Sequence, residues 1–133
     1  MKELELFIPI APVAASRPRV TRWATFYSKK YTAYRNVMEE HLSKRKDLIL
    51  FEKSVAIDKV IFYMKIPKLS KKKMADLVYK PHVKKPDIDN LLKALFDSLN
   101  GHVFRDDSII WKIENIQKIY SDVVGVGVHL KGA

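Results

Sequence analysis

The amino-acid sequence predicts an α+β fold: a single domain, residues 1–133, with a mixed β-sheet of about four strands and two main helices. Three observations support this prediction. Four segments alternate apolar and polar residues or are rich in β-branched and aromatic residues, as strands are. Two segments carry apolar residues at helical spacing. The 133 residues are 47% hydrophobic and contain no internal repeat or long linker, so one core is expected.

The chain begins with a predicted strand and a basic loop. Over Lys2–Pro9, the apolar residues Leu4, Leu6 and Ile8 alternate with polar ones, which is typical of a half-buried strand. Prolines then interrupt regular structure. The stretch Ser16–Arg22 contains three arginines and no acid, and we interpret it as an exposed basic loop.

A helix and a second strand are predicted next. Residues 28–46 carry apolar residues and a histidine near helical spacing: Tyr31, Tyr34, Val37, Met38, His41 and Leu42. Val55–Met64 is rich in Val, Ile, Phe and Tyr, which predicts a strand. Lys68–Lys85 carries seven lysines against one acid. We expect this segment to be an exposed, mobile connection with room for a short helical turn around Ser70–Tyr79.

The clearest helix follows Pro86 and spans Asp87–Asn100. Its apolar residues form one stripe: Ile88, Leu91, Leu92, Leu95, Phe96 and Leu99. An Asn-Gly pair provides the stop signal. Ile109–Tyr120 alternates as a strand, and a slip in its phase midway indicates a bulge. Val123–Leu130 closes the chain as a last strand. The predicted order is therefore β-α-β-α-β-β.

Charge is distributed unevenly along the chain. The net charge is +10 and the pI about 9.7. Residues 1–86 carry 20 Lys and Arg against 8 Asp and Glu, whereas residues 87–133 carry 5 against 7. A basic field of this kind attracts polyanions, so nucleic acid is the expected partner; greater solubility is the alternative interpretation.

Composition excludes several classes of protein. The chain has no cysteine, which excludes a disulfide framework and a zinc–thiolate site. Its N-terminus lacks the basic start of a signal peptide, and no apolar run approaches the ~20 residues that span a bilayer. We therefore expect a soluble, cytoplasmic protein with no membrane partner.

Four carboxylates and a lysine cluster within 21 positions of this basic chain: Asp87, Asp89, Lys93, Asp106 and Asp107. Mg²⁺ prefers oxygen ligands, and a chain that attracts phosphates while concentrating acids in one place suits metal-assisted hydrolysis of a phosphodiester. The alternative is helix capping, in which an aspartate accepts backbone N–H bonds. One aspartate suffices for capping, and two at this spacing exceed that need.

Lys93 follows Asp89 by four positions, so both lie on one helix face. Lys93 either forms a surface salt bridge of about 0.2–0.5 kcal/mol or stabilises the charge that develops on a phosphate in the transition state. Asp97, one turn further along, is either a partner of Lys93 or a surface residue. Strand alternation favours Asp107 over Asp106 as the inward-facing metal ligand.

Residues outside this cluster are candidates for contacts with nucleic acid. Trp23, Phe26, Tyr27, Tyr31 and Tyr34 are interspersed with basic residues; they either stack on splayed bases or pack in the core. No catalytic triad or glycine-rich phosphate loop stands out, and the four histidines lack metal-ligand spacing. The basic residues expected to hold phosphates are Arg17, Arg19, Arg22, Lys29, Lys30, Lys72, Lys73, Lys84 and Lys85.

The acidic block matches a known pattern. Residues 87–99 read Asp-Ile-Asp-Asn-Leu-Leu-Lys-Ala-Leu-Phe-Asp-Ser-Leu, and residues 104–107 read Phe-Arg-Asp-Asp. This block resembles the RusA family of Holliday junction resolvases, whose pattern is D-x-D-N-x-x-K-x-x-x-D, a short gap, then D-D before a strand. The Arg17-Pro18-Arg19 and 31–35 regions are similar to its phage-type branch, and the resemblance covers nearly the whole chain.

The resemblance implies a RusA-like fold and a homodimeric, Mg²⁺-dependent crossover junction endodeoxyribonuclease, with Mn²⁺ as a substitute metal. Such enzymes nick four-way branched DNA symmetrically in recombination and repair. By resemblance, Asp87, Asp89 and Asp107 are the catalytic metal ligands and Lys93 is the essential lysine. Asp106 matches a position that is usually acidic but less central. A phage or prophage origin is also implied.

Two other functions are compatible with the sequence. One is a basic nucleic-acid-binding module without activity, in which the acids cap a helix and form salt bridges. The other is a metal nuclease that acts on other branched or single-stranded DNA. Residues 68–85 are longer than in compact members of the family, so the resemblance does not define the path of DNA along them.

Overall fold

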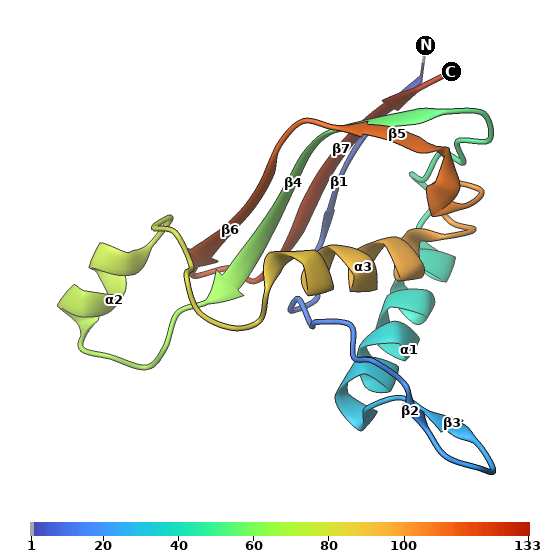
Figure 1. Ribbon diagram of the computed structural model, residues 1–133. Coiled ribbons are helices and arrows are strands. Elements are labelled where there is room, and N and C mark those ends of the chain that lie inside the picture. The colour runs from blue at the N-terminus through green and yellow to red at the C-terminus, as the bar shows by residue number, and fades with distance from the viewer. Residues whose placement is uncertain (1) are drawn as a thin grey trace.

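The computed structural model describes residues 2–133. A five-stranded mixed sheet is covered on one face by helices (Figure 1). The order is β1-β7-β4, and both β5 and β6 pair with the other edge of β4. Only the β4–β5 and β4–β6 pairings are parallel. The strands are β1 (Lys2–Ile8), β4 (Val55–Lys65), β5 (Ile110–Ile113), β6 (Ile116–Ser121) and β7 (Gly125–Gly132). The predicted α+β class is confirmed.

The sheet has five strands because the strand predicted over 109–120 divides in two. Between β5 and β6, the Glu114 amide donates to the Ile57 carbonyl and the Val60 amide donates to the Asn115 carbonyl, each at 2.9 Å. The register on β4 shifts beside this break. The slip in the hydrophobic pattern therefore marked a real irregularity.

Two helices pack on one face of the sheet (Figure 1). Helix α1 spans Lys29–Lys44 and begins at Ser28, whose hydroxyl accepts the Tyr31 amide at 3.2 Å. Helix α3 spans Ile88–Leu99. Both predicted helices are thus present, each within two residues of its expected ends. Their buried residues meet the inner face of the sheet in one core, with α1 contributing Tyr31, Tyr34, Met38 and Leu42 and α3 contributing Leu91, Ala94, Leu95, Ser98 and Leu99.

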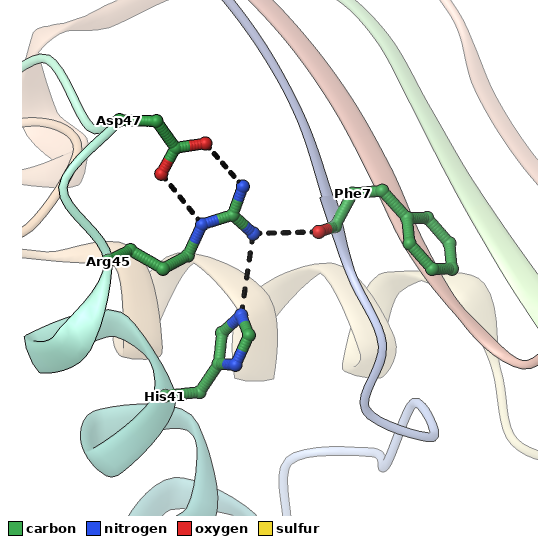
Figure 2. Close-up of polar contacts among 4 residues, drawn as sticks. All are labelled: Phe7, His41, Arg45 and Asp47. Carbon is green, nitrogen blue, oxygen red and sulfur yellow. Dashed lines mark hydrogen bonds and ion pairs between the residues drawn. The ribbon is translucent and has the colours of Figure 1, made fainter.

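Arg45 joins the end of α1 to the sheet (Figure 2). Its guanidinium donates to both carboxylate oxygens of Asp47, at 2.8 and 2.5 Å, and to the Phe7 carbonyl of β1 at 2.7 Å. The remaining contact is with the His41 ring at 3.4 Å. A bidentate arginine of this kind is a directional link, so α1 keeps a fixed position against β1.

Two regions differ from the prediction. The stretch interpreted as a basic loop contains half of a hairpin, in which β2 (Arg19–Val20) pairs with β3 (Thr25–Phe26). Helix α2 (Lys71–Leu77) fills the expected helical turn and is capped by Ser70. Residues 79–82 then bond along β6 through three backbone hydrogen bonds of 2.8–3.0 Å. Part of the segment expected to be a mobile connection is therefore fixed to the sheet edge.

The other face of the sheet carries polar side chains. Asp58 on β4 lies 3.0 Å from the Lys131 ammonium of β7 and also contacts His129, which bonds to Glu3 of β1. No helix covers this face in Figure 1. Among residues 2–133, no helix is both long and apolar enough to cross a membrane.

Candidate active site

Asp87 and Asp89 lie together at the start of α3. Asp87 occupies the N-cap position, yet its side chain accepts no capping hydrogen bond. The carboxylate is about half exposed, and the Lys85 ammonium lies 3.4 Å from it. Within the described residues 2–133, Asp89 accepts only the amide of its neighbour Asn90, at 2.9 Å. Helix capping, which satisfies an orphan N–H of the first turn, therefore does not account for the Asp87 carboxylate.

Hydrogen bonds to backbone carbonyls hold the start of α3, and the loop before it, from two sides. The Lys118 ammonium, from β6, donates to the carbonyls of Lys84 and Pro86, each at 2.6 Å. On the other side, the Ala15 amide donates to the Asn90 carbonyl at 2.9 Å. Sequence reasoning missed Lys118. The one signal that could have found it is a lysine inside a strand whose other residues alternate between apolar and polar. These bonds fix the loop that presents Asp87.

The two carboxylates open onto a cleft of about 680 Å³. Three lysines and two aspartates share its walls, so it can hold a cation at the acids and phosphate oxygens at the rim. Burial lowers the pKa of His82, and the positive charge of Lys118 lowers it further, so the imidazole is neutral near pH 7. The lining residues are His82, Val83, Lys84, Lys85, Asp87, Ile88, Asp89 and Lys118.

Lys93 is held by Asp97 rather than by Asp89. Its ammonium lies 3.4 Å from the Asp97 carboxylate, which also accepts the Tyr31 hydroxyl at 2.9 Å. Arg35 donates to that same hydroxyl at 3.3 Å. Burial is the main cause of the raised pKa of Tyr31, so the phenol stays protonated and donates to Asp97 at neutral pH. Asp97 is thus a partner of Lys93, as one of the two interpretations of the sequence predicted.

The sequence predicts Lys93 as the essential lysine of a DNA endonuclease. On that prediction, replacing Asp97 by asparagine should slow DNA cleavage about tenfold and leave DNA affinity nearly unchanged, because small misplacements of a catalytic group are costly. The variant keeps the shape of the side chain but removes the charge that orients Lys93. Single-turnover rates and DNA affinity measured side by side check this. Tyr31→Phe is the control, since it keeps the Asp97 carboxylate and loses the two hydrogen bonds of the Tyr31 hydroxyl. Weaker binding with an unchanged cleavage rate would contradict the positioning role.

Asp106 and Asp107 lie beyond the opposite end of α3. Asp107–Ile109 form a 3-10 turn, and the Asp106 carboxylate caps it by accepting the Ser108 amide at 3.2 Å. Hydrogen bonding by the Ser108 side chain, followed by this amide bond, lowers the pKa of Asp106. The Asp107 side chain is exposed, and no hydrogen bond or ion pair among residues 2–133 uses it. The prediction that strand alternation turns Asp107 inward was wrong, because the strand begins only at Ile110.

One chain does not bring the three predicted metal ligands together. Helix α3 has 12 residues, which separates its two ends by about 18 Å at 1.5 Å per residue. Asp87 and Asp89 lie at one end, and Asp107 follows the other (Figure 1). Within residues 2–133 no group of three His, Asp or Glu side chains is placed to hold a metal ion. A single chain therefore offers two carboxylates of the set.

The predicted DNA contacts lie on both sides of these acids. Arg17, Arg19 and Arg22 lie on or beside the β2–β3 hairpin, while Lys84 and Lys85 line the acidic cleft. The lysines at positions 29 and 30 open α1, and those at 72 and 73 lie on α2. In Figure 1 the hairpin and α2 flank the start of α3 on opposite sides. The basic residues therefore form two groups about the acids.

Three clefts surround the first turns of α3. The acidic cleft shares Asp87 with a neighbouring cleft of about 580 Å³, which also contains Asn90. Asn90 in turn lines a third cleft of about 700 Å³ together with Lys93, Arg17 and Arg35. Because adjacent clefts share residues, an extended polyanion has a path from the Lys84 side, past the acids, to the hairpin.

Comparison with known proteins confirms the family that the sequence resembles. The family model described as "Endodeoxyribonuclease RusA" matches residues 9–131. The chain is also similar to "Crossover junction endodeoxyribonuclease RusA" of Aquifex aeolicus (strain VF5), with 26% identity over 145 residues that cover 98% of this chain and 93% of the relative. The match of the family model begins after β1 and includes β4, β5, β6 and most of β7, both long helices and the acidic block. The chain belongs to the RusA family of endodeoxyribonucleases.

Proposed function

We propose that this endodeoxyribonuclease resolves four-way DNA junctions by paired, symmetric nicks in a Mg²⁺-dependent reaction, with Mn²⁺ as a substitute. The observation that carries the proposal is the Asp87 carboxylate, which stands at a helix start without a capping bond, beside Asp89, in a cleft rimmed by lysines. Acids in the middle of a basic surface suit a metal held against a phosphodiester.

The donor set of one chain fits Mg²⁺ in part. This ion is commonly bound by one or two carboxylates together with waters and substrate phosphates, which Asp87 and Asp89 can provide. Bound there, it supplies a nucleophilic water at neutral pH and polarises the phosphate. The protein's own contribution is to position that phosphate. Lys93, oriented by Asp97, offsets the negative charge that develops on it.

A second copy of the chain is proposed to supply the third carboxylate. Asp107 is exposed and about one helix length away from Asp87 in its own chain, so it can complete only the site of another copy. In a two-fold symmetric dimer each contact occurs twice, which yields two composite sites. A four-way junction has near two-fold symmetry, and two sites account for paired nicks. Light scattering at micromolar concentration should therefore report a dimer.

The basic residues on either side of the acids are proposed to hold the DNA backbone. They comprise Arg17, Arg19, Arg22, Lys29, Lys30, Lys72, Lys73, Lys84 and Lys85. Contacts of this kind set the register of the DNA and the salt dependence of binding and carry no sequence information. The protein is expected to act where its substrate lies, in the cytoplasm, and a phage or prophage origin stays a prediction.

Replacing Arg17 and Arg19 by alanine should weaken junction binding and lower the slope of log affinity against log salt by about 2, since each lost phosphate contact lowers it by about 0.9. Titrations between low and moderate salt measure the slope. The matched control replaces Lys46 and Lys53, two exposed lysines outside the clefts, and should leave it unchanged. If the slope of log affinity against log salt were equal in the two double variants, the hairpin would not contact the DNA.

Incubation with a labelled four-way junction tests the proposed function directly. Matched linear duplex, a flap and a three-way junction form the substrate panel, each with Mg²⁺, Mn²⁺ or chelator. Paired nicks in the four-way junction, dependent on the metal, are the expected result. Cutting that favours flaps or single strands would indicate a different branched-DNA nuclease. Tight binding without cleavage in either metal would indicate a non-catalytic DNA-binding module.

A further inference from the structure

The β2–β3 hairpin and its flanks, residues 17–28, form an arm that projects from the body of the molecule (Figure 1). Every residue of the arm is exposed. Three of its aromatic side chains, Trp23, Phe26 and Tyr27, are 85%, 55% and 53% exposed. Tyr31 and Tyr34, which follow in the sequence, are buried in the core instead. Core packing therefore explains the second pair. Tyr27 packs edge-on against Tyr31 at 5.8 Å between ring centres, whereas neither Trp23 nor Phe26 packs in the core of residues 2–133.

The tip of the arm is a turn built to present Trp23. The Thr21 amide donates to the Ala24 carbonyl at 2.8 Å. The Thr21 hydroxyl donates to the same carbonyl at 3.1 Å and accepts the amides of Trp23 and Ala24 at 3.3 and 3.1 Å. A turn held by its own side chain is ordered before it binds anything, which lowers the entropy cost of binding. Trp23, 85% exposed, is the third residue of this turn, which runs from Thr21 to Ala24.

The charge around Trp23 suits a nucleic acid. The arm and the first two residues of α1 carry five basic residues and no acid: Arg17, Arg19, Arg22, Lys29 and Lys30. The Arg22 guanidinium lies 5.2 Å from the centre of the Trp23 ring. Nucleic acids combine phosphates, which the cations bind, with flat bases, on which an indole stacks. In an intact duplex those bases are already stacked on each other, so a stacking indole favours DNA whose bases are unstacked.

The base of the arm is joined to the turn that carries the acids. Ala15, just before the arm, donates to the Asn90 carbonyl at 2.9 Å. The Ser28 amide donates to the Ser16 hydroxyl at 3.3 Å, which closes the arm at its base. Six residues of extended chain reach about 20 Å, so the tip has a limited range of distances from Asp87 and Asp89. The arm is thus positioned relative to the proposed site of cleavage.

We propose that Trp23 stacks on an unstacked base at the branch point of the DNA, so that the arm distinguishes branched DNA from continuous duplex. This inference rests on the proposed function, because it takes branched DNA as the substrate. The arginines of the arm then contact phosphates, and the Trp23 indole selects branched DNA over continuous duplex. Sequence-independent stacking suits this role, since every base has an aromatic face.

The chain offers a matched pair of fluorescent reporters. It has two tryptophans, and the other, Trp111 on β5, is 69% exposed and lies outside the arm. Trp111→Phe leaves Trp23 as the reporter, and Trp23→Phe leaves Trp111. In chelator, so that no DNA is cut, a four-way junction should quench Trp23 emission about twofold or more by stacking. Linear duplex should quench it weakly, and Trp111 should respond to neither DNA.

Affinities measured with the same two DNAs complete the test. Trp23→Ala should bind the junction about tenfold more weakly, or 1.4 kcal/mol, and the duplex as before; Trp23→Phe should keep most of the junction affinity. Equal quenching by both DNAs, or an unchanged preference in Trp23→Ala, would overturn the proposal. So would a blue shift of Trp23 with anionic phospholipid vesicles and no response to junctions. Quenching by junctions that the wild-type protein never cuts would instead overturn the proposed function alone.

Discussion

Asp89→Asn is expected to reduce metal-dependent junction cleavage by about 10²–10⁴-fold, because a carboxylate of the proposed metal site is lost. Binding of the junction in chelator should stay within about twofold, since most of the proposed phosphate contacts lie on the arm and the lysines. In the part of the chain that the structure describes, the exposed Asp89 side chain accepts only the Asn90 amide, and an asparagine oxygen can accept the same bond. The variant therefore removes charge with little change of structure.

Asp122→Asn is the matched control. Asp122 is exposed and lies in the turn between β6 and β7, outside the three clefts around α3, so its cleavage rate should equal that of the wild type. Rates and affinities of all three proteins, measured on one junction, separate the possibilities. A wild-type cleavage rate in Asp89→Asn would show that these acids take no part in the reaction. An equal loss of binding and cleavage would assign Asp89 to DNA binding.

Much of the fold could be predicted because local signals agreed with tertiary packing. The helix that begins at Ser28 carries both a capping serine and an apolar stripe, and tyrosines 31 and 34 of that stripe are buried as core residues. The helix after Pro86 carries an equally consistent stripe. When capping, spacing and burial favour the same structure, sequence alone identifies the element.

The arm and the lysine-rich segment lacked such signals. Strands β2 and β3 have two residues each, too short for an alternating pattern, and the Thr21 side chain that shapes their turn carries no distinctive spacing. Residues 79–82 add to the edge of β6 through backbone bonds, which depend little on side-chain identity. Interactions of this kind become visible only in three dimensions.

The sequence analysis named the residues of the candidate site without their geometry, and the site itself stays a prediction. It interpreted Asp87 and Asp89 as exceeding the needs of helix capping, and the structure leaves the Asp87 carboxylate without a capping bond. The length of the helix that follows them already implied a separation from Asp107 of about 18 Å. Asp87 and Asp107 lie within 21 positions of each other in the sequence. Those positions include the whole of α3, and the length of this helix keeps the two carboxylates apart.

Complementation between two inactive variants is the prediction that separates a composite site from a site within one chain. Asp89→Asn and Asp107→Asn should each be nearly inactive alone. In a mixed dimer, a composite arrangement places both substitutions in one site and leaves the other with Asp87, Asp89 and Asp107 intact. Equal amounts that exchange freely form mixed dimers in about half of the population, with one working site in each, so about a quarter of wild-type nicking should return.

The product distinguishes recovery from residual activity. A mixed dimer with one intact site should give single nicks in the junction, whereas two wild-type sites give paired ones. If each site instead came from one chain, every site in the mixture would carry one substitution, and no activity would return at any ratio. The exposed position of Asp107, one helix length from Asp87, makes recovery the expected result. Recovery would also show that catalysis requires the dimer, because neither chain alone would then hold a complete set of acids.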